Sequence, residues 1–268
     1  LGAPTVLTVR FGIGGAILAL IAAAAGRSLW PPRGERLACL LLGSVGYAIE
    51  SSLFFAGLQR GSAGAVTVIF YCYPAIVTGL EVLTGVFRLT WRLASAVALA
   101  GAGTATVVVS GSSVTLTTSA LAFTLSAAVA FALYLYANDR LLVRTDRMVA
   151  AAWASGGAAV GLAVRYSASG GFPSPAGYWP RLIGIGVVSA AAFGLLFVAL
   201  GRVGAARTSV ALNMEAVATV ALGAVFLGES LGPLQLLGGA AVLAAAVWIS
   251  LPAPQARLSR RRPCAGAR

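Results

Sequence analysis

The chain has 268 residues, of which 59% are hydrophobic and only 10% are charged, and its mean hydropathy is +0.91. Soluble domains have about 45–50% apolar and about 25% charged residues, so this composition excludes a water-soluble protein and indicates an integral membrane protein. The net charge of +12 comes from arginines that are spread between apolar runs. Because they form no single patch, a nucleic-acid partner is not expected.

Nine apolar runs of helix length follow one another along the chain. A helix needs about 20 residues to cross the hydrocarbon core, and the runs lack the alternation of membrane strands. The sequence therefore predicts an all-α polytopic helix bundle in the lipid bilayer. The runs are 4–25, 37–58, 64–86, 93–110, 118–138, 149–168, 181–201, 208–228 and 233–251.

The arginines give the predicted bundle an orientation. If the linker after run 4–25 is cytoplasmic, all but four of the 19 arginines fall on the cytoplasmic side. The exceptions are Arg10, Arg60, Arg165 and Arg181. This bias follows the positive-inside rule, so we expect a multi-pass protein of the cytoplasmic membrane whose C-terminus is cytoplasmic.

The chain contains a weak internal repeat at a shift of 142 residues. FAGLQRGSAG (55–64) aligns with FVALGRVGAA (197–206), which places Arg60 over Arg202. Those two arginines are predicted to lie on opposite sides of the membrane, so the repeats are inverted, as in many secondary transporters. We expect a first repeat at 1–115, a second repeat at 116–252 and an Arg-rich cytoplasmic tail at 253–268.

The repeat also predicts a helix upstream of the sequence. Run 118–138 has no counterpart in the first half, and the chain begins with Leu1. We therefore expect nine helices here of ten in the native protein. A secretory signal at 1–25 is the alternative, and it is disfavoured because no basic region precedes the apolar run.

Three segments resemble the EamA repeats of the drug/metabolite transporter superfamily. Residues 53–85 and 213–248 resemble the two repeats, and VLTVRFGIGGAILAL (6–20) resembles the second helix of that family. Two positions depart from the family pattern: Ala216 replaces a proline that commonly follows the glutamate, and Val86-Phe87 replaces a Gly-Glu pair. The resemblance implies ten helices, export or exchange of small metabolites, often amino acids, and a central cavity.

Glu50 is the most informative residue of run 37–58. An ionised side chain at that depth costs about 2.5–3.5 kcal/mol or more if it faces lipid, so Glu50 must face the interior, be paired, or be protonated. Tyr47, Glu50, Ser51 and Phe54 share one helical face. Cation binding or proton coupling in a cavity is one interpretation, and a buried glutamate that serves packing is the other.

The neighbouring runs carry further cavity candidates. Run 64–86 has a stripe that includes Tyr71 and Pro74, and we expect Pro74 to kink the helix. Glu81, on the same stripe, is expected to be solvated or paired with Arg88 or Arg92. In the second half, the candidates are the repeat equivalents Ser189, Phe193 and Asn213 together with Glu215.

Arg10 lies at a depth similar to that of Glu50. We hypothesise that the two residues pair or jointly hold a zwitterion such as an amino acid, and the alternative is that Arg10 snorkels to the interface. The predicted function is a secondary transporter of amino acids or related amphiphilic solutes. It would work by alternating access, in the efflux direction, with protons as a coupling ion.

Other function classes have less support. A non-transporting membrane scaffold or lipid-handling protein is the alternative, and the absence of HExxH, Asp-rich and GxSxG motifs argues against an enzyme. With no histidine and three scattered cysteines, we expect neither a metal nor a cofactor. The sequence leaves open the substrate, the direction of transport, the coupling ion and whether the protein is a homodimer.

Overall fold

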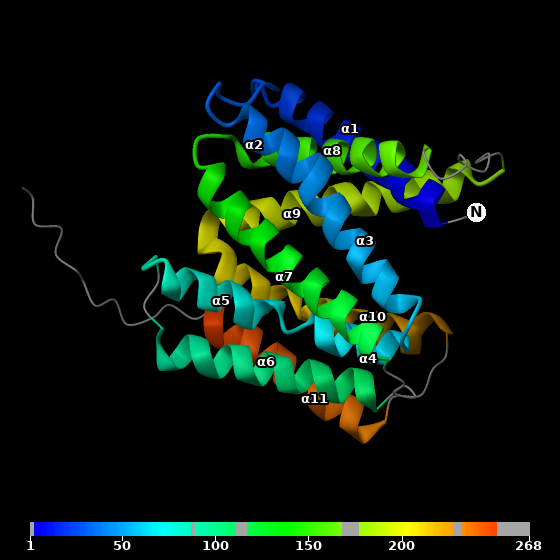
Figure 1. The fold of residues 1–268 in the computed structure, drawn as a ribbon, viewed down its shortest axis with the longest axis vertical. Helices are drawn as coiled ribbons and strands as arrows, with labels where there is room; N and C mark the ends of the chain where they lie inside the picture. Colours follow the sequence, from blue (N-terminus) through cyan, green and yellow to red (C-terminus); the bar gives the residue numbers. More distant parts are fainter. Residues whose placement is uncertain (1–2, 87–88, 111–116, 168–176, 228–231, 251–268) are drawn as a thin grey trace, which may run out of the picture.

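The computed structural model describes residues 3–86, 89–110, 117–167, 177–227 and 232–250, and the regular structure in these ranges is helical (Figure 1). The predicted all-α polytopic bundle is therefore confirmed. The predicted tail at 253–268 and Arg88 lie outside the described residues. In chain order the elements are α1 (Ala3–Ala24), α2 (Arg36–Leu41), η1 (Leu42–Gly46), α3 (Tyr47–Leu58), α4 (Ala63–Phe70), α5 (Tyr73–Leu83), α6 (Trp91–Val109), α7 (Thr118–Leu141), α8 (Arg147–Ser167), α9 (Trp179–Leu212), α10 (Met214–Leu227) and α11 (Pro233–Ser250).

Six helical segments in the described ranges are long and apolar enough to cross a membrane. This confirms the multi-pass class that the composition predicts. The six are Thr5–Ala24, Arg36–Leu58, Ala65–Leu83, Thr118–Leu141, Arg147–Ser167 and Trp179–Leu212.

The predicted run 64–86 is not one continuous helix. It is broken at Tyr71 and Cys72, and Pro74 lies in the first turn of α5, directly after the break. Proline is tolerated there because the N–H that it lacks would have no intrahelical acceptor in the first turn. The chain therefore interrupts the helix before Pro74.

The two repeats are related by the 142-residue shift element by element. The shift carries α1 onto α8, α2 and α3 onto the first part of α9, α4 and α5 onto the end of α9 and α10, and α6 onto α11. The break at Tyr71–Cys72 falls on Asn213–Met214, where α9 gives way to α10. Both repeats thus have an interrupted helix at the same position.

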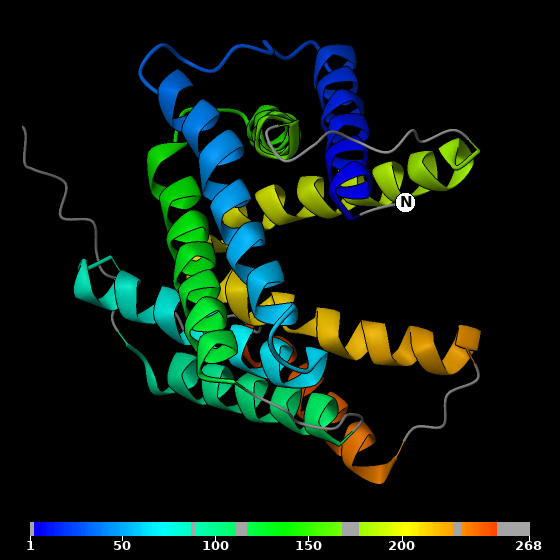
Figure 2. The same cartoon turned by 45° about the vertical axis from the view of Figure 1, so that its right-hand side comes forward.

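The packing agrees with a pseudo-twofold axis between the repeats. The most extensive helix–helix contacts are α1 with α8 and α6 with α11, which are the two pairs of repeat equivalents that meet each other (Figure 2). A helix packs on its own equivalent only where it lies next to the axis. The two most extensive interfaces of the bundle are therefore between symmetry-related helices.

Glycines allow very close packing of the first repeat on α8. A Cβ atom at Gly43 would lie 2.6 Å from the carbonyl oxygen of Trp153, and one at Gly157 would lie 2.9 Å from the backbone of Gly43. A Cβ at Gly161 would overlap the carbonyl oxygen of Ser44. The π-helical turn η1 therefore contacts α8 backbone to backbone.

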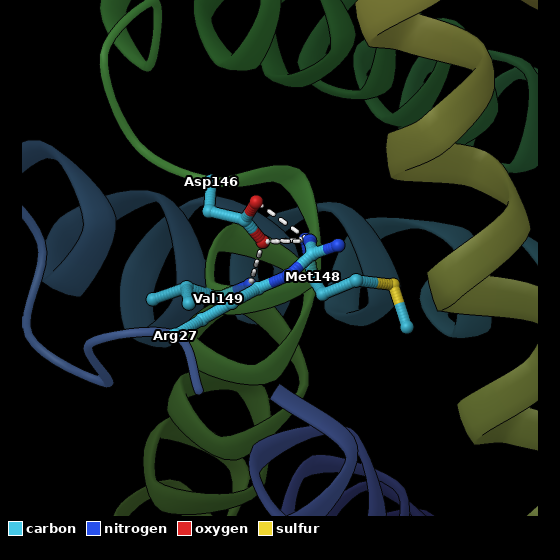
Figure 3. A network of polar contacts seen from close by, with 4 residues as sticks. All are labelled: Arg27, Asp146, Met148 and Val149. Carbon is cyan, nitrogen blue, oxygen red and sulfur yellow. Dashed lines mark hydrogen bonds and ion pairs between the residues drawn. The ribbon is translucent and has the colours of Figure 1, made fainter. Parts of the chain in front are cut away.

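One end of the bundle carries most of the described arginines, and we call it the arginine-rich end. It comprises the end of α1, the start of α2, the ends of α5 and α7, and the start of α8 (Figure 2). Arg27 Nη1 lies 2.6 Å from both oxygens of Asp146, which also accepts from the backbone N–H groups of Met148 and Val149 (Figure 3). This network fixes the end of α1 to the start of α8.

Candidate functional site

A cavity of about 790 Å³ lies between α1, α3, α9 and α10. Five of the residues that the sequence nominates line it, contributed by both repeats. These five are Arg10, Tyr47, Ser189, Phe193 and Glu215, and the remaining lining residues are Phe11, Arg181, Gly184, Ile185, Val188 and Ala192.

Three aromatic rings from three helices form one wall of the cavity. The ring of Phe11 lies 5.0 Å from that of Tyr47 and 5.4 Å from that of Phe193, and the last two are 5.6 Å apart. All three pairs meet edge to face, the arrangement that the ring quadrupoles favour. The wall is therefore rigid and presents apolar ring surface to an occupant.

The rings continue beyond the cavity into the middle of the bundle. Tyr47 contacts Tyr134, and the contacts then pass through Phe131 and Tyr73 to Phe70. The centroid distances along this path are 5.9, 6.3, 4.8 and 5.4 Å. We call this path the ring layer.

Two arginines bring positive charge to the cavity. The guanidinium carbon of Arg10 lies 4.4 Å from the centre of the Phe11 ring, and its buried Nε has no hydrogen-bond partner among the described residues. Arg181 lies at the start of α9 and is exposed. A guanidinium with an unused donor beside a cavity is suited to bind a carboxylate.

Glu50 lies beside the cavity but not on its surface. Its side chain is 6% exposed and accepts a hydrogen bond of 3.2 Å from the hydroxyl of Ser51. Arg10 and Glu215 both act on it electrostatically. Within the described part of the chain, no ion pair joins Arg10 to Glu50 within 4.0 Å.

Tyr71 and Asn213 lie at the two helix breaks. Asn213 is 1% exposed, and in the part of the chain that the structure describes neither its amide nitrogen nor its amide oxygen has a hydrogen-bond partner. Tyr71 is half-buried and interacts electrostatically with Glu215. The structure places both residues close behind the cavity rather than on its surface.

Comparison with known proteins identifies the family of the chain that forms this cavity. The model of the EamA-like transporter family matches residues 1–109 and 118–251. The chain belongs to the EamA-like transporter family. Among curated proteins, no relative matches it.

A solved structure, titled "Crystal structure of protein", is similar to this EamA-like chain at 17% sequence identity, with a TM-score of 0.82. The match covers 94% of this chain and 89% of that chain. At this identity the likeness shows a shared fold. It agrees with the helix bundle described above.

The sequence alone did not identify every lining residue of this EamA-like protein. Phe11 and Arg181 were not nominated, because an aromatic residue in an apolar run and an arginine at a helix start each have an ordinary explanation. The adjacency of Arg10 and Phe11 could have indicated Phe11. Ile185 and Val188 left no signal at all, since any lipid-facing helix has such residues. In the described ranges, no group of three His, Cys, Asp or Glu side chains could hold a metal ion.

Proposed function

We propose that this EamA-like protein is a secondary transporter whose cavity binds an amino acid or a related amphiphilic zwitterion. The observation that carries the proposal is the cavity itself, which combines Arg10 with Glu215 beside a wall of Phe11, Tyr47 and Phe193. A zwitterion with an apolar side chain needs a cation, an anion and an apolar surface in one space.

Each part of such a substrate has a partner in the cavity. The carboxylate is bound by the free Nε of Arg10, with Arg181 at the cavity surface as a second cation. The ammonium group is bound by Glu215. The apolar side chain packs on the rings and gains dispersion energy. The ring faces also attract the ammonium group of the substrate by cation–π interaction.

The proposed transport cycle is alternating access. The cavity surface holds Arg10 and Arg181, which lie near the start of α1 and the start of α9. This is the end of the bundle opposite the arginine-rich end. In the proposed cycle this end and the arginine-rich end open in turn as one repeat moves against the other. Efflux as the direction rests on the family resemblance, and proton coupling rests on the buried carboxyl of Glu50.

Flux measurements in proteoliposomes test the proposal. A panel of amino acids, amines and nucleosides is assayed with and without an imposed pH gradient. We expect saturable flux of amino acids, with Arg10→Ala raising the half-saturation concentration about tenfold or more because a charged hydrogen bond of about 1.5–3 kcal/mol is lost. Glu50→Gln is expected to abolish the stimulation by the gradient.

Arg165→Ala is the matched control, because Arg165 lies near the same end of the bundle on α8 and does not line the cavity. Its flux should equal that of the wild type. Saturable flux that is indifferent to Arg10→Ala would remove the substrate assignment but keep a transporter. No flux for any compound would favour the scaffold or lipid-handling alternative.

A further inference from the structure

Helix α9 is interrupted at Gly204, near the arginine-rich end. Gly204 has φ 81° and ψ 173°, a backbone conformation that only glycine adopts readily. The ribbon reverses its direction between the first part of α9 and α10 (Figure 2). The short helical segment 205–212 that follows is called the hinge segment below, and it leads directly to Asn213 and Glu215.

Two carboxylates from other helices hold the start of the hinge segment. Glu81 of α5 accepts a hydrogen bond of 3.3 Å from the backbone N–H of Ala206. The backbone N–H of Ala205 acts electrostatically on both Glu81 and Asp139 of α7. A Cβ atom built on Gly204 would lie 4.0 Å from an oxygen of each carboxylate. The N–H of Ala206 is therefore capped by Glu81, which is distant in sequence, and the Asp139 carboxylate lies close to the same turn.

The equivalent position in the first repeat is built differently. The 142-residue shift carries Gly204 onto Ser62, whose hydroxyl accepts from the backbone N–H of Ala65 at 3.4 Å. Ser62 has an ordinary extended conformation and caps its own helix α4. Only the second repeat, among these two described helix starts, depends on carboxylates from elsewhere. This asymmetry indicates a role beyond helix capping.

Among the described residues, Glu81 has no direct ionic partner. Glu81 is 3% exposed, and in the described ranges no arginine lies within 4.0 Å of its oxygens. Asp139 lies 4.0 Å from Arg140 and is also influenced by Arg147 of α8. Arg140 and the Asp139 carboxylate both act on Glu81, and Arg207 lies on the hinge segment itself.

We propose that Glu81 and Asp139 are positioning residues that form a protonatable latch on the hinge segment. As carboxylates they bind the first N–H groups of the segment, where the helix dipole also favours negative charge. A proton taken up from water converts a carboxylate into a carboxylic acid, which is a weaker acceptor for these N–H groups. The latch then loosens, and the segment that carries Glu215 into the cavity becomes free to move.

The latch connects protonation at the arginine-rich end to movement of the segment that leads to Glu215 in the cavity. Tyr73 of α5 donates to the carbonyl oxygen of Ser209 at 3.3 Å, so the hinge segment is bound to the first repeat at two points. Releasing the Glu81 contact leaves Tyr73 as a pivot. This inference rests on the proposed function, because the hinge segment matters to transport only if the cavity binds substrate.

Amide hydrogen exchange of the full chain in lipid nanodiscs tests the latch without any transport assay. Exchange of peptides covering 204–212 is measured between pH 5 and pH 8 and corrected for the intrinsic pH dependence of exchange. In the wild type we expect protection to fall as the pH is lowered. In the double variant Glu81→Gln, Asp139→Asn we expect exchange at least tenfold faster at pH 8 and no remaining pH dependence.

Glu35→Gln is the matched control, since Glu35 also accepts from backbone N–H groups at this end, those of Arg144 and Thr145. It should leave the hinge segment unchanged. Wild-type protection in the double variant, or a pH dependence that persists in it, would overturn the latch. Absence of flux with the exchange result intact would instead reject the proposed function.

Discussion

Asp146 combines two kinds of contact at the start of α8. Partial burial alone would raise the pKa of Asp146, but hydrogen bonds from Arg27 and from the N–H groups of Met148 and Val149 outweigh it, so its pKa is lowered. The same balance lowers the pKa of Glu35, whose partners are Thr145 and the backbone of Arg144. Both carboxylates therefore favour the folded state as anions.

Asp146→Ala should lower the free energy of unfolding by about 1–2 kcal/mol, because it removes an N-cap. Asp146→Asn keeps an acceptor for Met148 and Val149 and loses only an exposed ion pair, so we expect a loss below about 1 kcal/mol. Denaturant unfolding in micelles, followed by tryptophan fluorescence, measures both values. Equal losses in the two variants would show that the ion pair, rather than the cap, is the main contribution.

The pH dependence of this contribution has a definite sign. Because the pKa of Asp146 is lowered in the folded state, the contribution is complete above the ordinary Asp pKa of about 3.9 and is lost as the pH falls below that value. Between pH 6 and pH 3 the stability difference between wild type and Asp146→Asn should therefore shrink. A difference that grows on acidification would contradict the assignment.

Single residues were predictable from sequence where a charge stood in an apolar run. Arg10 and Glu215 line the cavity as nominated, since the cost of exposing a charge to lipid leaves few places for it. The expected pairing of Glu81 with Arg92 is wrong: Glu81 binds the N–H of Ala206, and Arg92 donates to the carbonyl oxygen of Trp248. The positive φ of Gly204 interrupts the helix and so makes the N–H of Ala206 available to Glu81. This backbone conformation could not be predicted from the sequence.

At the scale of elements, the contact between η1 and α8 depends on residues without side chains. Gly43 and Gly157 bring the two backbones together, and Gly161 faces the carbonyl oxygen of Ser44. A π-helical turn within a spanning helix also changes which side chains face the interior after it. Tyr47 and Glu50 follow η1 directly, so this contact helps to set the direction of the cavity wall.

Gly161→Ala should destabilise the bundle by about 1–3 kcal/mol, because its Cβ atom has no room against Ser44. Gly156→Ala on the same helix is the matched control, since a Cβ there meets nothing within 4 Å. Its expected effect is neutral or stabilising by up to about 1 kcal/mol, because alanine is the better helix former. Thermal unfolding in detergent distinguishes the two, and a stable Gly161→Ala would refute the close packing of η1 on α8.

The apolar runs predicted the helices and Pro74 predicted an interruption of run 64–86, whereas the interruption at Gly204 was not predicted. Run 181–201 lies in α9 before the non-helical residue Gly204, and run 208–228 is divided between the end of α9 and α10. Run 64–86 divides into α4 and α5 because Pro74 cannot continue a helix without losing a hydrogen bond. Hydropathy is blind to such local backbone changes, since the residues around them remain apolar.

At the scale of the whole molecule, inverted repeats place equivalent loops on opposite sides of the membrane. Gln59 and Val203 lie in repeat-equivalent turns at opposite ends of the bundle, and both are exposed. Composition and arginine placement were enough to predict the fold class. They could not predict the cavity, which depends on how α9 and α10 diverge from α1 and α3.

Cysteine labelling in intact cells tests this arrangement. In a chain whose Cys39, Cys72 and Cys264 are replaced, Gln59→Cys should react with a membrane-impermeant maleimide from outside. Val203→Cys should react only after the membrane is made permeable, because the arginine-rich end is expected to face the cytoplasm. Labelling of both from one side would refute the inversion, and the reverse pattern would overturn only the orientation.

The ring layer has an electrical consequence. Rings in contact from Tyr47 to Phe70 leave no room for a hydrated ion between them. In a membrane that carries a voltage, most of the voltage difference falls across such a dry layer. Moving one net charge past it involves about 2.3 kcal/mol per 100 mV, whereas a zwitterion passes without electrical work. Any current that accompanies flux is therefore carried by protons or by a charged substrate. The ratio of this current to the flux gives the number of net charges that cross the ring layer with each substrate molecule.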